Sequence, residues 1–152
     1  MPTERYRPVV DRWLKRIAEV GLAETISEIT RPDVQLINPG QTADLQGLVA
    51  RFREVERAFP DAVVTVDDIV EDGQRLVLVV EIRATHLGPL RNIPATGRPV
   101  RFGMVFLMYM EGDQVARVRM FPEFFSAMVQ MGIMPEFDAG GYDAGSQPAA
   151  QA

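Results

Sequence analysis

The 152-residue sequence has no cysteine, a single histidine and no long apolar run. Without cysteine there is no disulfide, no thiolate nucleophile and no cysteine-ligated metal site, and a lone histidine makes a zinc site difficult to build. No stretch approaches the run of about 20 apolar residues that a membrane-spanning helix needs. The first residues also lack the apolar segment of a secretory signal. We therefore expect no cysteine-ligated metal site and no zinc site, no membrane partner and a cytoplasmic location.

Basic residues are few and scattered along the chain. There are 16 Lys and Arg against 21 Asp and Glu, which gives a net charge of −5. A nucleic-acid-binding protein normally carries a basic stripe or patch, so we expect no nucleic-acid partner. The length suits one globular domain, which we place at residues 1–137. Residues 138–152 are poor in large apolar groups, and this composition predicts a disordered C-terminal tail.

The order of apolar patterns predicts an α+β domain. Helical spacing marks residues 4–20, 22–29, about 43–58, and a last helix that begins at Pro122 and ends at Gly132. Apolar runs and alternation predict strands at residues 34–37, 62–69, 76–86, 98–110 and 114–121. Helices that precede a meander predict a curved antiparallel sheet wrapped around the N-terminal helices. Such a sheet forms a cone with an apolar cavity between sheet and helices.

The single histidine ends a row of apolar residues on the predicted strand 76–86. Because side chains alternate along a strand, His86 shares one face with four apolar residues: Leu78, Val80, Ile82 and Ala84. An inward histidine with an unperturbed pKa of about 6.5 suits proton transfer or a hydrogen bond to a substrate carbonyl. The structural alternative is a partly exposed histidine that bonds to the following loop. The pattern leaves both interpretations open.

Five short motifs, in order along the chain, carry a family resemblance. They are Ala58-Phe59-Pro60-Asp61, Ala84-Thr85-His86-Leu87-Gly88, Ile93-Pro94-Ala95-Thr96-Gly97-Arg98-Pro99-Val100, Glu111-Gly112-Asp113-Gln114-Val115 and Gln130-Met131-Gly132. With this order and spacing, residues 10–133 resemble the SnoaL-like polyketide cyclases. The resemblance implies the α+β cone that this family shares with scytalone dehydratase, ketosteroid isomerase and nuclear transport factor. It also implies a homodimer that pairs through the outer face of the sheet.

The resemblance further implies an enzyme of secondary metabolism that acts on a polyketide-derived or aromatic molecule without metal or organic cofactor. Ring closure, or a related isomerisation, dehydration or epoxide opening, would proceed by acid/base catalysis. The position of the family's catalytic aspartate falls on Met120, whose thioether cannot transfer a proton. The second acidic position matches Glu123, and a strand end that lines the family's pocket matches Asn38. We predict His86 as the main proton-transfer or carbonyl-polarising group, assisted by Glu123 and Asn38.

Several of these residues also have a structural interpretation. A glutamate in the first turn of a helix, such as Glu123, favours the helix dipole, and Asn38-Pro39-Gly40 is a turn sequence. Strand alternation places Met120 on the apolar face, whereas a one-residue bulge would turn Arg119 inward instead. Tyr109 has a phenol that can donate to an oxyanion, but its direction stays open.

Seven of the eight methionines lie after residue 100. Methionine adapts to bulky ligands, and we predict that apolar side chains form the substrate-binding wall: Trp13, Phe59, Met104, Phe106, Met108, Met120, Phe124 and Met128. Plain core packing is the alternative for each. We expect Thr96 and Arg98 to shape the loop at the mouth, and Val77 and Val79 to suit pairing of two sheets. Met120 also favours a non-catalytic carrier, and family relatives that hydroxylate their substrates suggest a cofactorless or flavin-assisted oxygenase.

Overall fold

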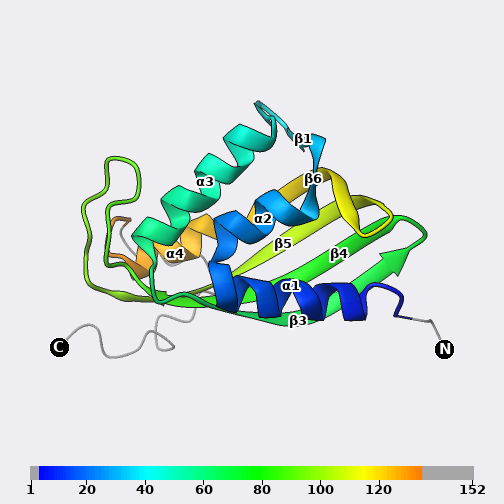
Figure 1. The fold of residues 1–152 in the computed structure, drawn as a ribbon. Coiled ribbons are helices and arrows are strands. Elements are labelled where there is room, and N and C mark those ends of the chain that lie inside the picture. The colour runs from blue at the N-terminus through cyan, green and yellow to red at the C-terminus, as the bar shows by residue number, and fades with distance from the viewer. Residues whose placement is uncertain (1–3, 135–152) are drawn as a thin grey trace.

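The computed structural model describes residues 4–134, so the predicted tail 138–152 and the predicted domain end at residue 137 lie outside the described residues. Within this range, four helices pack on a six-stranded open sheet (Figure 1). The helices are α1 (Arg7–Val20), α2 (Leu22–Ile29), α3 (Leu45–Ala58) and α4 (Phe124–Gln130). The strands are β1 (Thr30–Asn38), β2 (Gln41–Ala43), β3 (Val63–Asp72), β4 (Arg75–Thr85), β5 (Pro99–Glu111) and β6 (Gln114–Pro122). The predicted α+β class is confirmed.

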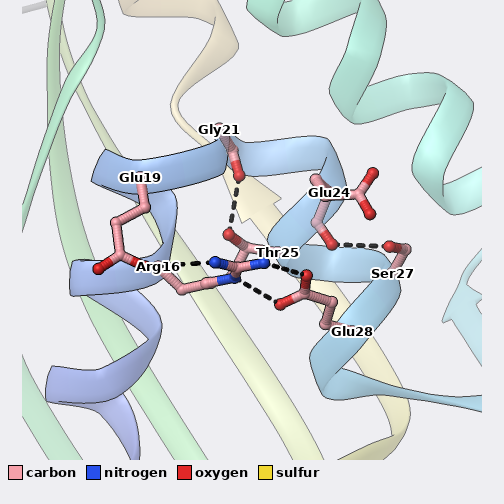
Figure 2. Close-up of polar contacts among 7 residues, drawn as sticks. All are labelled: Arg16, Glu19, Gly21, Glu24, Thr25, Ser27 and Glu28. Atoms are coloured by element: carbon pink, nitrogen blue, oxygen red, sulfur yellow. Dashed lines mark hydrogen bonds and ion pairs between the residues drawn. The ribbon is translucent and has the colours of Figure 1, made fainter.

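The two N-terminal helices are joined by a polar cluster, which Figure 2 shows. Arg16 of α1 donates two hydrogen bonds of 2.8 Å to the carboxylate of Glu28 on α2, and a third of 3.3 Å to Glu19. The guanidinium holds the pKa of Glu28 below its usual value. At the junction, the Thr25 hydroxyl donates to the carbonyl of Gly21 at 2.7 Å. None of the described helices is long and apolar enough to cross a membrane.

The sheet is mixed rather than wholly antiparallel, with strand order β2-β1-β6-β5-β4-β3. Strands β3 to β6 form the predicted antiparallel meander, but β1 runs parallel to β6. The prediction of an antiparallel sheet was wrong for this pair, because the residue pattern of a strand does not encode the direction of its neighbour. Strand β2 was not predicted, since three residues are too few to show a period.

At two of the element boundaries that differ from the prediction, a proline is involved. Strand β1 begins at Thr30 in spite of Pro32, because its register on β6 shifts between Thr30 and Gln35. A proline, which lacks an N–H, is tolerated at such an irregularity. Pro122 does not start the last helix: it still pairs with Met104 of β5, so α4 begins only at Phe124.

The two faces of the central strands differ as alternation predicted. Strand β6 contains a bulge at Ala116, where the pairing with β5 shifts register. Beyond the bulge, Met120 lies on the buried face and Arg119 on the opposite, outer face. Tyr109 also lies on the outer face, with the guanidinium of Arg117 4.2 Å from its ring centroid. The bulge therefore does not turn Arg119 into the cone.

Candidate ligand-binding site

Two adjoining cavities lie between the helices and the sheet. The inner cavity, of about 120 Å³, lies under the N-terminal helices, and its lining includes Val10, Trp13, Leu14, Ile17, Ile26, Phe59, Leu78, Val80, Phe106 and Met108. The mouth cavity, of about 400 Å³, is lined by Asn38, Gln41, Arg51, Phe52, Glu54, Val55, Leu90, Arg91, Ile93, Met104, Met120, Pro122, Phe124 and Met128. A groove of about 870 Å³ between α2 and α3 is larger, but its lining includes no aromatic side chain.

The predicted apolar wall is divided between the two cavities. Trp13, Phe59, Phe106 and Met108 line the inner cavity alone. Met120 and Met128 line the mouth cavity alone, whereas Met104 and Phe124 line both. The wall residues therefore surround a continuous apolar region, although their contact with a substrate stays a prediction.

Polar side chains gather at the rim of the mouth cavity. From α3, Arg51 donates from Nη1 to the Gln41 side-chain oxygen at 3.1 Å. Also from α3, Glu54 accepts the backbone N–H of Arg91 at 2.8 Å. Glu54 is the one carboxylate among the residues described as lining this cavity. A ligand in the mouth cavity would thus meet an apolar wall and a charged rim.

Asn38 lines the mouth cavity, but its amide is engaged with the protein. Its Nδ2 donates to the carbonyl of Met120 at 2.8 Å, and its Oδ1 accepts the N–H of Met120 at 2.9 Å. The side chain thus continues the β1–β6 pairing by one step and holds Met120 at the cavity wall. Both polar atoms of Asn38 are thus occupied, and its assisting catalytic role stays a prediction.

His86 is fully buried, with 0% of its surface exposed, and it is not among the lining of either cavity. Its Nδ1 accepts the backbone N–H of Thr96 at 3.2 Å and lies 3.0 Å from the Thr96 hydroxyl. Because Nδ1 accepts, the neutral ring carries its proton on Nε2, which has no hydrogen-bond partner among the described residues. Burial lowers the pKa of His86, and a smaller interaction with the backbone of Gly88 raises it.

These contacts match the interpretation of His86 as a residue that bonds to the following loop. That interpretation expected partial exposure and was wrong in this respect, because loop 87–98 and Phe59 enclose the imidazole. The ring centroids of Phe59 and His86 are 5.5 Å apart. The catalytic role of His86 stays a prediction.

Glu123 is exposed and lines neither cavity. Its Oε2 accepts the backbone N–H of Gly103 at 2.7 Å. It was expected in the first turn of the last helix, but it precedes α4, and its side chain makes no capping hydrogen bond. A catalytic role for Glu123 also stays a prediction.

The loop 87–98 lies against the C-terminal end of α3 (Figure 1). Its residues Leu90, Arg91 and Ile93 line one side of the mouth cavity. The N–H groups of Leu87 and Gly88 both donate to the carbonyl of Ala58, at 3.0 and 3.1 Å. At its far end, the carbonyl of Arg98 accepts the N–H of His86 at 2.9 Å, while Thr96 bonds to the imidazole. Thr96 and Arg98 thus shape the loop, as expected.

The charged rim was not predicted from the sequence. A signal existed on α3, where Arg51 and Glu54 are the direct neighbours of the inward-facing Phe52 and Val55. Helical spacing therefore places the two charged side chains at the border of any cavity that Phe52 and Val55 line. No comparable signal existed for Arg91, because a loop has no period that assigns a side chain to a face.

Comparison with known proteins agrees with this geometry. A family model described as SnoaL-like polyketide cyclase matches residues 8–131. The candidate hydroxylase AclR from Streptomyces galilaeus superposes with a TM-score of 0.76 at 19% identity, covering 85% of this chain and 96% of AclR. IdmH, a candidate polyketide cyclase from Streptomyces antibioticus, gives 0.69 at 22% identity, with 85% and 99% covered.

A Catenulispora acidiphila protein with a ketosteroid isomerase-like fold gives a TM-score of 0.66 at 13% identity, with 84% of this chain and 95% of that chain covered. No curated protein matches the chain. The family model covers most of the sequence, and the solved structures share the cone. The chain therefore belongs to the SnoaL-like polyketide cyclase family.

Proposed function

We propose that the protein is a cofactor-independent enzyme of secondary metabolism that acts on an aromatic or polyketide-derived molecule in the mouth cavity. The observation that carries the proposal is the wall of Met104, Met120, Phe124 and Met128 around a space of about 400 Å³. Ligand pockets of this size and apolar character hold drug-sized molecules, and methionine adapts to flat ring systems. The reaction would be ring closure, or a related isomerisation, dehydration or epoxide opening.

The proton-transfer group in this proposal is Glu54. Its Oε1 accepts the Arg91 N–H, and the second oxygen is left to take a proton from a carbon beside a substrate carbonyl. The resulting enolate would attack a second carbonyl of the same molecule. As the new carbon–carbon bond forms, the π bond of that carbonyl breaks, and the proton held by Glu54 passes to the alkoxide oxygen. Holding both ends of the chain in the cavity supplies much of the acceleration, because the step becomes effectively unimolecular.

The test combines binding and turnover. Native mass spectrometry and thermal shift against anthraquinones, naphthoquinones and linear polyketide methyl esters would identify a ligand, and product analysis would detect conversion. Glu54→Gln should then abolish conversion and leave ligand affinity within a few-fold of wild type. The matched control is Glu24→Gln, since Glu24 is exposed on α2 and lies outside the cavity. Conversion that survives Glu54→Gln and is lost in His86→Gln would transfer the role to His86.

A non-catalytic carrier is the second candidate. It is supported by Met120, which places a thioether in the cavity wall at the position matched to the family's aspartate. The amide of Asn38 and the carboxylate of Glu123 also bond to backbone groups. Tight binding without conversion, unchanged by Glu54→Gln, would establish a carrier. Oxygen uptake in the presence of ligand would instead indicate hydroxylation, the activity for which AclR is named.

We further propose a homodimer that pairs through the outer sheet face, with a cytoplasmic location. Large apolar side chains are exposed there: Val63 at 58%, Val70 at 51% and Phe121 at 46%. The half-buried Val77 and Val79 continue this surface on β4. Covering such a patch removes apolar area from water. Sedimentation at several concentrations tests the dimer, which a purely monomeric profile would exclude.

A further inference from the structure

The rim of the mouth cavity carries two arginines without a carboxylate partner. Arg51, half-buried on α3, donates to the neutral side-chain oxygen of Gln41. Arg91 is exposed at the tip of loop 87–98. Neither takes part in any ion pair found within residues 4–134. Carboxylates outnumber basic groups 21 to 16 in this chain, yet these two guanidinium groups remain available to another anion.

The backbone around Arg91 holds this residue at the rim. Leu90 and Ile93 exchange two backbone hydrogen bonds, of 3.0 and 2.9 Å, which close a tight turn. Within that turn Arg91 has a φ of 52°, the only positive φ outside glycine in residues 4–134. Backbone positions of this kind are uncommon and cluster at ligand sites. The bond from the Arg91 N–H to Glu54 anchors the turn to α3.

We propose that Arg51 and Arg91 bind an anionic group of the ligand, a carboxylate, while its ring system lies against the Met/Phe wall of the mouth cavity. The inference rests on the proposed function and deepens it, because it names the substrate class as an aromatic or polyketide-derived acid rather than a neutral ester. A guanidinium offers a carboxylate two parallel N–H donors. The adjacent apolar wall strengthens the attraction, since it lowers the local dielectric constant.

The charges at the rim are balanced for such a ligand. Arg51 and Arg91 contribute two positive charges and Glu54 one negative charge, so a single ligand carboxylate neutralises the group. The hydrogen bond to Gln41 orients the Arg51 guanidinium without neutralising its charge. A neutral ester would instead leave the rim with a net positive charge and one fewer acceptor for these donors.

The experiment compares two probes that differ only at the anion: 9,10-anthraquinone-2-carboxylate and its methyl ester. Quenching of the single tryptophan, Trp13, reports the Kd of each. Wild-type protein should bind the acid at least about tenfold more tightly, the size of effect expected for charge-assisted hydrogen bonds. This preference should shrink in about 1 M NaCl, where the Debye length is about 3 Å.

Variants assign the preference to the two arginines. Arg51→Gln and Arg91→Gln should each reduce the affinity for the acid, and the double variant should bind acid and ester equally, with ester affinity unchanged throughout. Arg53→Gln is the matched control, because it removes the same charge from an exposed position of α3 outside the cavity. Arg51→Lys adds a second check, since it keeps the charge but loses the paired donors.

Each outcome has one meaning. Equal binding of acid and ester by the wild type, with both weakened by Met128→Ala, would overturn the carboxylate site and leave the proposed function standing. An acid preference that persists in the folded double variant would also overturn it. If neither probe binds, and none of the wider panel of quinones and esters does, both the site and the proposed function are lost.

Discussion

The inner and mouth cavities are neighbours with opposite character. The inner cavity, of about 120 Å³, is lined by apolar side chains apart from Thr25, most of them from α1, α2 and the central strands. The mouth cavity, of about 400 Å³, adds five polar or charged residues to its apolar wall, drawn from the end of β1, the start of β2, α3 and a loop. One end of the cone therefore resembles a protein core, and the other resembles a binding site.

We expect this difference to separate the residues that stabilise the fold from those that recognise a ligand. Side chains of the inner cavity contact other apolar groups, so their loss should lower the free energy of unfolding. Side chains of the mouth border open space, so their loss should change affinity with little effect on stability. Substitutions at the two ends can therefore test whether the division holds.

The largest combined effect, on stability and ligand binding together, is expected from Gly88→Ala, which disturbs the contact between α3 and loop 87–98. A Cβ at this position would lie 2.0 Å from the carbonyl oxygen of Arg57, a backbone atom that cannot move alone. The loop would have to leave α3, breaking the two hydrogen bonds to Ala58. We expect a loss of about 3 kcal/mol in unfolding free energy and loss of ligand binding, measured by urea denaturation and Trp13 quenching.

Gly112→Ala is the control for this substitution. Gly112 has a φ of 61°, and no atom lies within 4 Å of the point that a Cβ would occupy, so alanine there meets only the left-handed backbone penalty, about 1 kcal/mol. Ligand affinity should stay unchanged. Equal losses for the two variants would show that the close contact at Gly88 has no importance for the mouth.

The next prediction compares one wall residue from each end. Trp13→Ala removes a buried side chain from the inner cavity and should lower unfolding free energy by about 3–5 kcal/mol. Met128→Ala removes a half-buried side chain from the mouth and should lower it by only about 1 kcal/mol. Ligand affinity should fall more in Met128→Ala than in Trp13→Ala, and isothermal titration calorimetry measures it in both variants. If both substitutions weaken binding equally, the two cavities act as one site.

The inner cavity could be predicted from sequence because its residues follow regular periods. On β4, alternate residues from Leu76 to Ala84 are buried, since the outer face of the same strand carries charged groups such as Glu81 and Arg83. On α1, the buried Val9, Val10 and Trp13 follow the helical period. A local pattern is sufficient where one face packs and the other meets water.

The mouth could be predicted only in part, because its geometry depends on contacts between distant segments. Asn38 was identified at a strand end, but its partner Met120 lies 82 residues further along the chain. Two other contacts likewise join segments that no local pattern connects: the hydrogen bond from the Gly88 N–H to the Ala58 carbonyl, and that from the Arg91 N–H to Glu54. The direction of β1 was missed for the same reason, because its parallel partner β6 is distant in sequence.

A smaller effect is expected from Asn38→Ala. The substitution leaves the N–H and carbonyl of Met120 without their partners in a partly buried position. We expect a loss of about 1–2 kcal/mol in unfolding free energy, together with weaker ligand binding, because Met120 is no longer held at the wall. Thermal denaturation and Trp13 quenching provide the two measurements. Unchanged affinity at reduced stability would limit Asn38 to a role in the sheet.

The smallest effect is a pH dependence at the mouth that the inner cavity should not share. Burial lowers the pKa of His86 below its ordinary value of 6.5. Between the lowered pKa and about 6.5, the unfolded chain binds a proton that the native protein does not, so stability rises with pH across this window. The contribution is complete above about pH 6.5 and is lost as the pH falls toward the native pKa.

Protonation of Nδ1 also removes the acceptor of the Thr96 N–H and so loosens the loop that carries Arg91. Ligand affinity should therefore fall together with stability on acidification. Because the sequence contains one histidine, urea unfolding between about pH 5.5 and about pH 7.5 reports largely on this residue. His86→Gln should flatten the dependence of the unfolding free energy on pH. An unchanged dependence would assign it to carboxylates elsewhere, and the mouth would then be no more sensitive to pH than the inner cavity.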